Sequence, residues 1–187
     1  MLLCCCASTA TTAPPAPAPS APAASAPAPT KPACASAERR QLDFWLGDWD
    51  VAIRARASPT SEQWGHAKGR QRIETILDGC AIAETFTADG PQAPWAGRSY
   101  SSWQPALGKW RQTWVDDSGG YIALTGGIEN GDMTLYGEPR TVDDESFQMR
   151  MVFKNVTADA LLWEWQRSTD SWKTQIVMMA IDYKRRR

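Results

Sequence analysis

Residues 146–168 read SFQMRMVFKNVTADALLWEWQRS, and the alternation within this stretch decides the fold class. From Phe147 to Phe153 every second residue is apolar, and most of the residues between them are polar. Residues 160–168 repeat the pattern. Successive side chains of a β-strand point to opposite faces, so a period of two predicts strands with one dry face and one wet face.

The same period recurs along most of the chain. Turn signals such as Asp78-Gly79 and Asn130-Gly131 separate the segments, so neighbours in sequence should pair as antiparallel hairpins. We expect ten strands, at residues 49–55, 69–76, 81–88, 97–103, 109–116, 121–127, 132–138, 146–153, 160–168 and 172–183. An open meander would leave two exposed edges, so the predicted fold is all-β, an antiparallel up-and-down β-barrel of about ten strands. A β-sandwich is the main alternative, although its crossing connections usually need longer loops.

The segment before the first expected strand reads QLDFWLG and spans residues 41–47. Leu42, Trp45 and Leu46 have the spacing of a single helical turn, and Gly47 is placed to end it. We expect this short N-terminal turn to cover one open end of the barrel with its aromatic rings.

Two resemblances agree with a barrel. Gly47-Asp48-Trp49 resembles the Gly-x-Trp signature of lipocalins and other calycins, in which the tryptophan closes the base of the barrel, so Gly47 and Trp49 would form the barrel plug. The succession FWLGDWDV, RIETILDGCAIAETF, SYSSWQPALGKWRQTWVDDSGGYIALTGG and MTLYGEPR resembles an uncharacterised family of exported, lipocalin-like bacterial proteins, of the domain-of-unknown-function 1579 sort or a close sibling. The resemblance extends from about Arg40 to Tyr183. It implies a calycin-like barrel and no established activity.

The sequence of the N-terminal region predicts a sorting signal followed by a linker. Residues 1–8, MLLCCCAS, resemble the end of a bacterial lipoprotein signal, with a leucine three places before Cys6, the expected lipidation site. Cys5 is the second choice, a disordered cytosolic tail is the alternative, and we expect the true start to lie further upstream. Residues 9–37 are rich in Ala and Pro and predict a disordered, semi-rigid linker, which leaves residues 38–184 for the barrel. The expected location is the periplasm or cell envelope, with a lipid anchor.

Cysteine usage fits an oxidising compartment. Cys34 lies just before the barrel and Cys80 follows a turn within it, so we predict a disulfide between them, with a buried free Cys80 as the alternative. We expect no metal site, because the barrel region has no Cys-x-x-Cys pair and the chain has one histidine. Haem is not expected either: small barrels of the nitrobindin type hold haem through a histidine late in the chain, and none follows His66. No cofactor is predicted.

Charge and residue types narrow the function. The 20 basic and 21 acidic side chains nearly cancel, so no nucleic-acid partner is indicated. We expect His66 to be solvated rather than a catalytic base, and we assign no catalytic residue. Carboxylate chemistry is harder to exclude, because Glu74, Glu84 and Asp116 lie on expected strands. If Glu84 points inward, burial should raise its pKa. The alternative to a catalytic role for Glu84 is a structural one, in which its carboxylate bonds to an interior Arg or Tyr.

Two functional classes remain. The first is a binding module whose cavity or mouth holds a small, partly apolar or amphipathic molecule, opening at the end away from the plug. The second is a structural or interaction protein of the envelope with a filled barrel. Strand parity predicts these ligand-binding residues: Trp114, Gln112, Trp110, Glu84, Tyr100, Met149, Met151, Trp163 and Trp165.

Overall fold

The computed structural model describes residues 34, 36–90 and 94–187. The expected lipidation site Cys6, and the linker up to residue 33, lie outside the described residues. Two short 3-10 turns come first, η1 (Glu38–Arg40) and η2 (Asp43–Trp45). The strands follow as β1 (Gly47–Ala55), β2 (Gly65–Ile76), β3 (Ala81–Asp89), β4 (Pro94–Gln104), β5 (Lys109–Asp116), β6 (Tyr121–Glu129), β7 (Asp132–Gly137), β8 (Arg140–Val142), β9 (Glu145–Lys154), β10 (Ala160–Ser168) and β11 (Ile176–Arg185).

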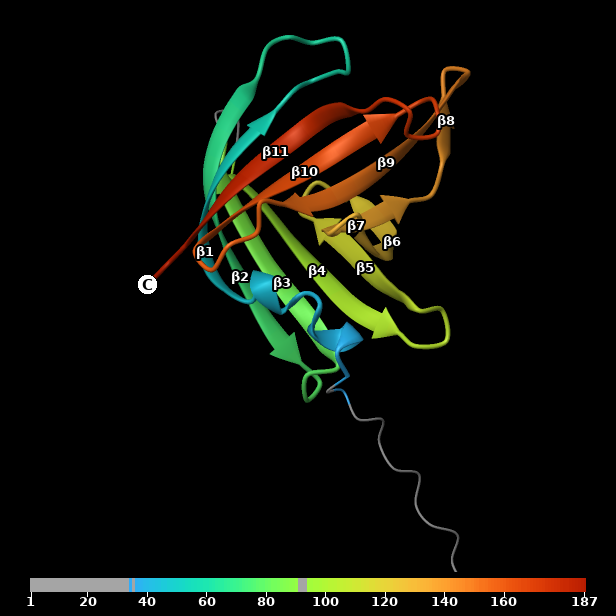
Figure 1. Ribbon diagram of the computed structural model, residues 1–187. Helices are drawn as coiled ribbons and strands as arrows, with labels where there is room; N and C mark the ends of the chain where they lie inside the picture. Colours follow the sequence, from blue (N-terminus) through green and yellow to red (C-terminus); the bar gives the residue numbers. More distant parts are fainter. Residues whose placement is uncertain (1–33, 35, 91–93) are drawn as a thin grey trace, which may run out of the picture. The chain divides into compact units, whose positions relative to one another are not determined.

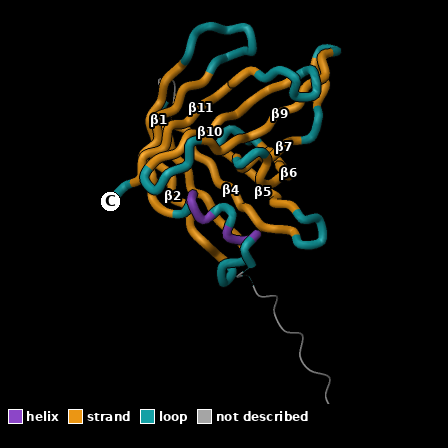
Figure 2. Tube along the Cα trace, viewed as in Figure 1, coloured by secondary structure: helices purple, strands orange, loops and turns teal. Residues whose placement is uncertain are grey.

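Within these described ranges the strands form a closed antiparallel barrel. Consecutive strands pair, except that β7 pairs with β9 rather than with β8, and the pairing of β1 with β11 closes the ring. The strand β8 pairs with residues 145–147 of β9 and stays outside the ring. Ten strands therefore make the barrel, as predicted, and β8 projects from the end opposite the two 3-10 turns (Figures 1 and 2).

The alternation of buried residues explains why these segments form a barrel. In β1, Trp49, Val51 and Ile53 are buried and the residues between them are exposed. In β3, Glu84 and Phe86 are buried with Ile82 and Ala88 on the same face, and the residues between them are half-buried or exposed. One face of each strand thus meets the interior and the other meets solvent, which is the pattern that a closed sheet requires.

The last strand starts later than expected. It begins at Ile176 rather than at Trp172, because Ser171 and Trp172 have positive φ angles of 57° and 68° and end the extended conformation. The Asp170 carboxylate stabilises this loop by accepting a hydrogen bond from the Thr174 amide at 3.0 Å. A turn that needs left-handed backbone at a serine and a tryptophan gives no glycine or asparagine signal in the sequence.

The aromatic residues around Gly47 close the base of the barrel. Trp49 is fully buried and donates its indole N–H to the carbonyl oxygen of Trp45 at 2.8 Å. The guanidinium of Arg185 lies 4.0 Å from the centre of the Trp49 ring and donates to the carbonyl oxygen of Leu46 at 2.6 Å. Gly47 has a φ of 119°, a conformation that favours glycine, and a side chain there would collide with Arg185. Gly47 and Trp49 are therefore placed in the plug, with Arg185 as a third member.

The disulfide between Cys34 and Cys80 joins the segment before η1 to the turn between β2 and β3. Both ends lie at the plugged end of the barrel, since η1 lies beside β4 there and the β2–β3 turn closes the same end (Figure 1). The disulfide closes a loop of 46 residues. It therefore ties residue 34 to the base of the barrel.

Candidate functional site

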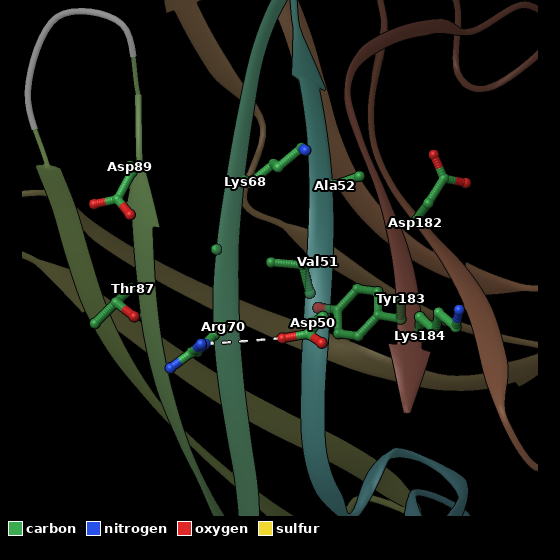
Figure 3. Close-up of a pocket in the computed structure, with 11 residues that line it drawn as sticks. Asp50, Val51, Ala52, Lys68, Arg70, Thr87, Asp89, Asp182, Tyr183 and Lys184 are labelled. Carbon is green, nitrogen blue, oxygen red and sulfur yellow. Dashed lines mark ion pairs between the residues drawn. The ribbon is translucent and has the colours of Figure 1, made fainter. Parts of the chain in front are cut away.

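The barrel encloses a cavity of about 160 Å³. A larger hollow of about 760 Å³ lies on the outer face, where β11, β1, β2 and β3 run side by side (Figure 3). The outer hollow is open to solvent and carries charges of both signs, including an exposed Arg70–Asp50 ion pair at 3.8 Å. The interior cavity is the smaller of the two but contains buried polar groups, which need partners, and we regard it as the candidate site.

Glu84 dominates the floor of the cavity. Its Oε1 accepts a hydrogen bond from Gln71 Nε2 at 2.9 Å, and its Oε2 accepts one from the Ser99 hydroxyl. Burial raises the pKa of Glu84 from 4.5 to about 7, and the Ser99 hydrogen bond opposes this only in part. The expectation that Glu84 points inward with a raised pKa is confirmed. Its partners are an amide and a hydroxyl, however, and not the interior Arg or Tyr that the sequence suggested.

Three further polar groups meet at the floor. The Trp45 indole and the Gln71 side chain face the hydroxyl of Tyr183. Burial and Glu84 raise the pKa of Tyr183, and hydrogen bonding from Gln71 and Trp45 opposes that shift. Neither Trp45 Nε1 nor Gln71 Oε1 reaches well-formed hydrogen-bond geometry with the described residues. The floor is therefore polar but loosely hydrogen-bonded, so a guest can compete for these groups.

Aromatic rings form the walls above this floor. Phe86, Trp95 and Trp114 meet edge to face, with ring centres 4.7 to 5.8 Å apart. On the far side, Trp163 and Trp165 lie parallel, with an interplanar angle of 3° and centres 6.1 Å apart. All five rings line the cavity and offer flat, polarisable faces to an aromatic or apolar guest.

Small residues of β4 make room for the rings of β5. Gly97, Ser99 and Ser101 face inward opposite Asp116, Trp114 and Gln112. A side chain at Gly97 would overlap the Trp114 ring, so the glycine is needed for a close approach of ring to backbone.

Asp116 holds Trp114 in place at the mouth. Its Oδ2 accepts a hydrogen bond from Trp114 Nε1 at 3.0 Å, while its Oδ1 accepts one from the Gly120 amide at 2.9 Å. The pKa of Asp116 is lowered, first by the hydrogen bond from the Ser118 side chain and also by that from Trp114. The rim carboxylate is therefore ionised at neutral pH.

Six of the nine residues that parity predicted line the cavity: Trp114, Gln112, Glu84, Met151, Trp163 and Trp165.

Three do not. Tyr100 is 56% exposed and points outward, because Ser99 and Ser101 occupy the inner face of β4. Trp110 is buried at the plugged end, where its indole donates to Gln41 Oε1 at 3.1 Å. Met149 is half-buried on β9 and is not part of the lining. These three residues therefore lie outside the cavity lining. Tyr100 is on the outer face of β4, and for Trp110 and Met149 parity determines the face of the strand but not the height along the barrel.

Sequence reasoning missed several lining residues. They are Trp45, Gln71, Phe86, Trp95, Asp116, Ile122, Leu124, Met179, Ile181 and Tyr183. The signal for some of them was present: Trp95 has the same parity in β4 as the inward-facing Ser99 and Ser101, and Phe86 shares a face of β3 with Glu84. It was absent for Trp45, which reaches the cavity from a 3-10 turn rather than from a strand.

The described residues include no group of three or more His, Cys, Asp or Glu side chains that could hold a metal ion. No helix in the same ranges is long and apolar enough to cross a membrane. His66, on β2, is exposed.

Comparison with known proteins places this geometry in context. The family described as "Protein of unknown function (DUF1579)" matches residues 35–185. A sequence search of curated proteins found no match. Among solved structures, Rv2717c from M. tuberculosis is 13% identical, with a TM-score of 0.56 over 81% of this chain and 99% of the other. The S-type phycobiliprotein lyase CPES from Guillardia theta is 11% identical, with a TM-score of 0.52 over 82% of this chain and 95% of the other. Likeness at this level shows a shared barrel fold.

Proposed function

The chain belongs to the DUF1579 family, and we propose that its barrel binds a small, partly apolar molecule in the interior cavity. One observation carries the proposal: a buried polar floor, made by Glu84, Gln71 and Tyr183, lies beneath walls of aromatic rings. Apolar walls with a few convergent polar groups are the usual make-up of small-molecule sites. The fold shared with a phycobiliprotein lyase is consistent with this proposal but does not carry it.

The cavity volume limits the size of the guest. At about 160 Å³ it is smaller than the roughly 300–1,000 Å³ typical of pockets for drug-sized ligands. The guest is therefore a small molecule, or one end of a longer molecule whose remainder extends past Trp114 and Asp116 at the mouth. A structural barrel without a ligand is the competing function, and the experiment below decides between them.

The test uses N-phenyl-1-naphthylamine, a neutral dye whose emission rises in apolar surroundings. The parent protein should bind it saturably and lose Trp emission. Trp114→Ala and Trp163→Ala should each weaken binding by about 1–3 kcal/mol, the scale of lost aromatic burial. Tyr100→Ala is the matched control, because it removes an aromatic ring from the outer face, and it should bind the dye as the parent does.

The outcomes separate the two functions. If the folded parent shows no saturable binding, the barrel is a structural element of the envelope and the proposal fails. If Tyr100→Ala weakens binding as much as the two cavity variants, the dye lies outside the barrel and the interior site is refuted.

We also propose that the protein acts in the periplasm or cell envelope, anchored through a lipid on Cys6. The disulfide between Cys34 and Cys80 supports an oxidising compartment, and the lipoprotein-like residues 1–8 support the anchor. Mass spectrometry of the N-terminal peptide from the native source should find a lipidated cysteine. A peptide that begins with unmodified Met1 contradicts the anchor.

A further inference from the structure

The charges that face the cavity are all of one sign. Among the described residues that line it, Glu84 at the floor and Asp116 at the rim are the ionisable acids, and there is no Lys, Arg or His. Asp116 is held ionised by its hydrogen bonds. A guest that carried a carboxylate would add another negative charge to a buried site with no cation among the described lining residues to balance it, which disfavours its binding.

The floor offers more acceptors than donors. A carboxylate has about four acceptor positions, and Glu84 uses one on each oxygen, for Gln71 and Ser99. Gln71 Oε1 adds an acceptor without a well-formed hydrogen bond, although it faces the Tyr183 hydroxyl. Against these stands one donor in the same state, the Trp45 indole N–H, which faces the same hydroxyl. A guest is therefore best matched when its polar end donates hydrogen bonds toward Glu84.

The walls favour a flat guest and tolerate positive charge. Trp163 and Trp165 present parallel faces, and Phe86, Trp95 and Trp114 surround the other side. The negative face of an aromatic ring attracts a cation as well as the edge of another ring. Both effects strengthen where water is excluded.

Resting on the proposed function, we propose that the cavity selects small aromatic molecules that are neutral or cationic and carry an N–H or O–H donor, and discriminates against carboxylates. Glu84 is the residue that sets this selectivity, because it is the charged group at the closed end of the cavity. Its raised pKa, about 7, agrees with a carboxylate that lacks a cationic partner until a guest provides one.

Three naphthalene probes of matched shape test this class at pH 8: 2-naphthylmethylamine, 2-naphthalenemethanol and 2-naphthoate. Calorimetric titration of the full chain should show the amine binding most tightly, and both the amine and the alcohol binding at least about tenfold more tightly than the carboxylate. In Glu84→Gln the amine should lose its advantage over the alcohol, while both still bind. Asp182→Asn is the matched control, since it removes one negative charge from the outer face and should keep the parent order.

Each outcome is decisive. If no probe binds saturably to the parent, the proposed function fails and the selectivity fails with it. If the carboxylate binds as tightly as the amine, the cavity binds ligands but the selectivity is refuted. If folded Glu84→Gln keeps the full preference for the amine, Glu84 does not set the selectivity. The order of the three probes on the parent protein tests the class even if that variant does not fold.

Discussion

Glu84→Gln should make the protein more stable at neutral and alkaline pH, although it alters the floor of the binding cavity. The carboxyl of Glu84 has a pKa of about 7 in the folded state against an ordinary value of 4.5, mainly because it is buried. Between these two values the folded state binds more protons than the unfolded state. Stability therefore falls as pH rises from 4.5 to about 7, and it changes no further above that range.

The size of the effect follows from the two pKa values. Each pH unit between 4.5 and about 7 lowers the free energy of unfolding by about 1.4 kcal/mol for this group, so the total approaches about 3 kcal/mol at pH 8. Glutamine has the same shape as glutamate and no charge. Its amide can still accept one hydrogen bond at the floor, from Gln71 or Ser99. The variant should match the parent near pH 4.5 and exceed it by up to about 3 kcal/mol at pH 8.

Urea unfolding followed by Trp fluorescence, at intervals from pH 4.5 to pH 8, measures both curves. Glu74→Gln is the control, because Glu74 is an exposed carboxylate paired with Arg72 and should leave the shape of the pH profile as in the parent. If the stability of Glu84→Gln and that of the parent change with pH in parallel, or if the variant is the less stable one at pH 8, the assignment of a buried carboxylate with a raised pKa is refuted. A confirmed gain would fit a functional residue kept at a cost in stability.

Three further predictions concern packing, the plug and the disulfide. Gly97→Ala should displace the Trp114 ring, lower stability by about 1–3 kcal/mol and weaken dye binding; unchanged near-ultraviolet dichroism and unchanged affinity would contradict this. Arg185→Ala should lose about 2–3 kcal/mol in urea unfolding, because the guanidinium bonds backbone carbonyls of the plug, and a loss under 1 kcal/mol would contradict that role. The double variant Cys34→Ser/Cys80→Ser should lose about 2–4 kcal/mol, and dithiothreitol should lower the melting temperature of the parent but not of the variant.

The alternation of apolar and polar residues and the spacing of the turns were sufficient to predict the barrel architecture. Segments with a period of two, separated by turns too short for crossover connections, leave few options besides a meander, and closure removes its exposed edges. Gly47 could be placed at the end of the first turn because glycine is favoured where a turn ends. The structure agrees, since Gly47 has a φ of 119°, a conformation that favours glycine. The inward position of Glu84 followed from its apolar neighbours on the same strand face.

Parity could not determine the site. Trp110 and Trp114 share one face of β5 but lie four residues apart, a separation of about 13 Å along the strand. Trp114 therefore reaches the cavity while Trp110 packs at the plug. The choice depends on how far each strand is shifted against its neighbours, which is set by the stagger of the whole barrel rather than by any one segment.

By itself the sequence predicted the ten-stranded barrel and the alternation of inward and outward faces, because these depend on local period; the Gly-x-Trp plug was expected from the resemblance to calycins. The tertiary structure alone decided which inward residues meet in one cavity, how small that cavity is, and that Gln71, Trp45 and Tyr183 meet beside Glu84. These features arise from residues far apart in the chain, brought together by strand register and barrel closure.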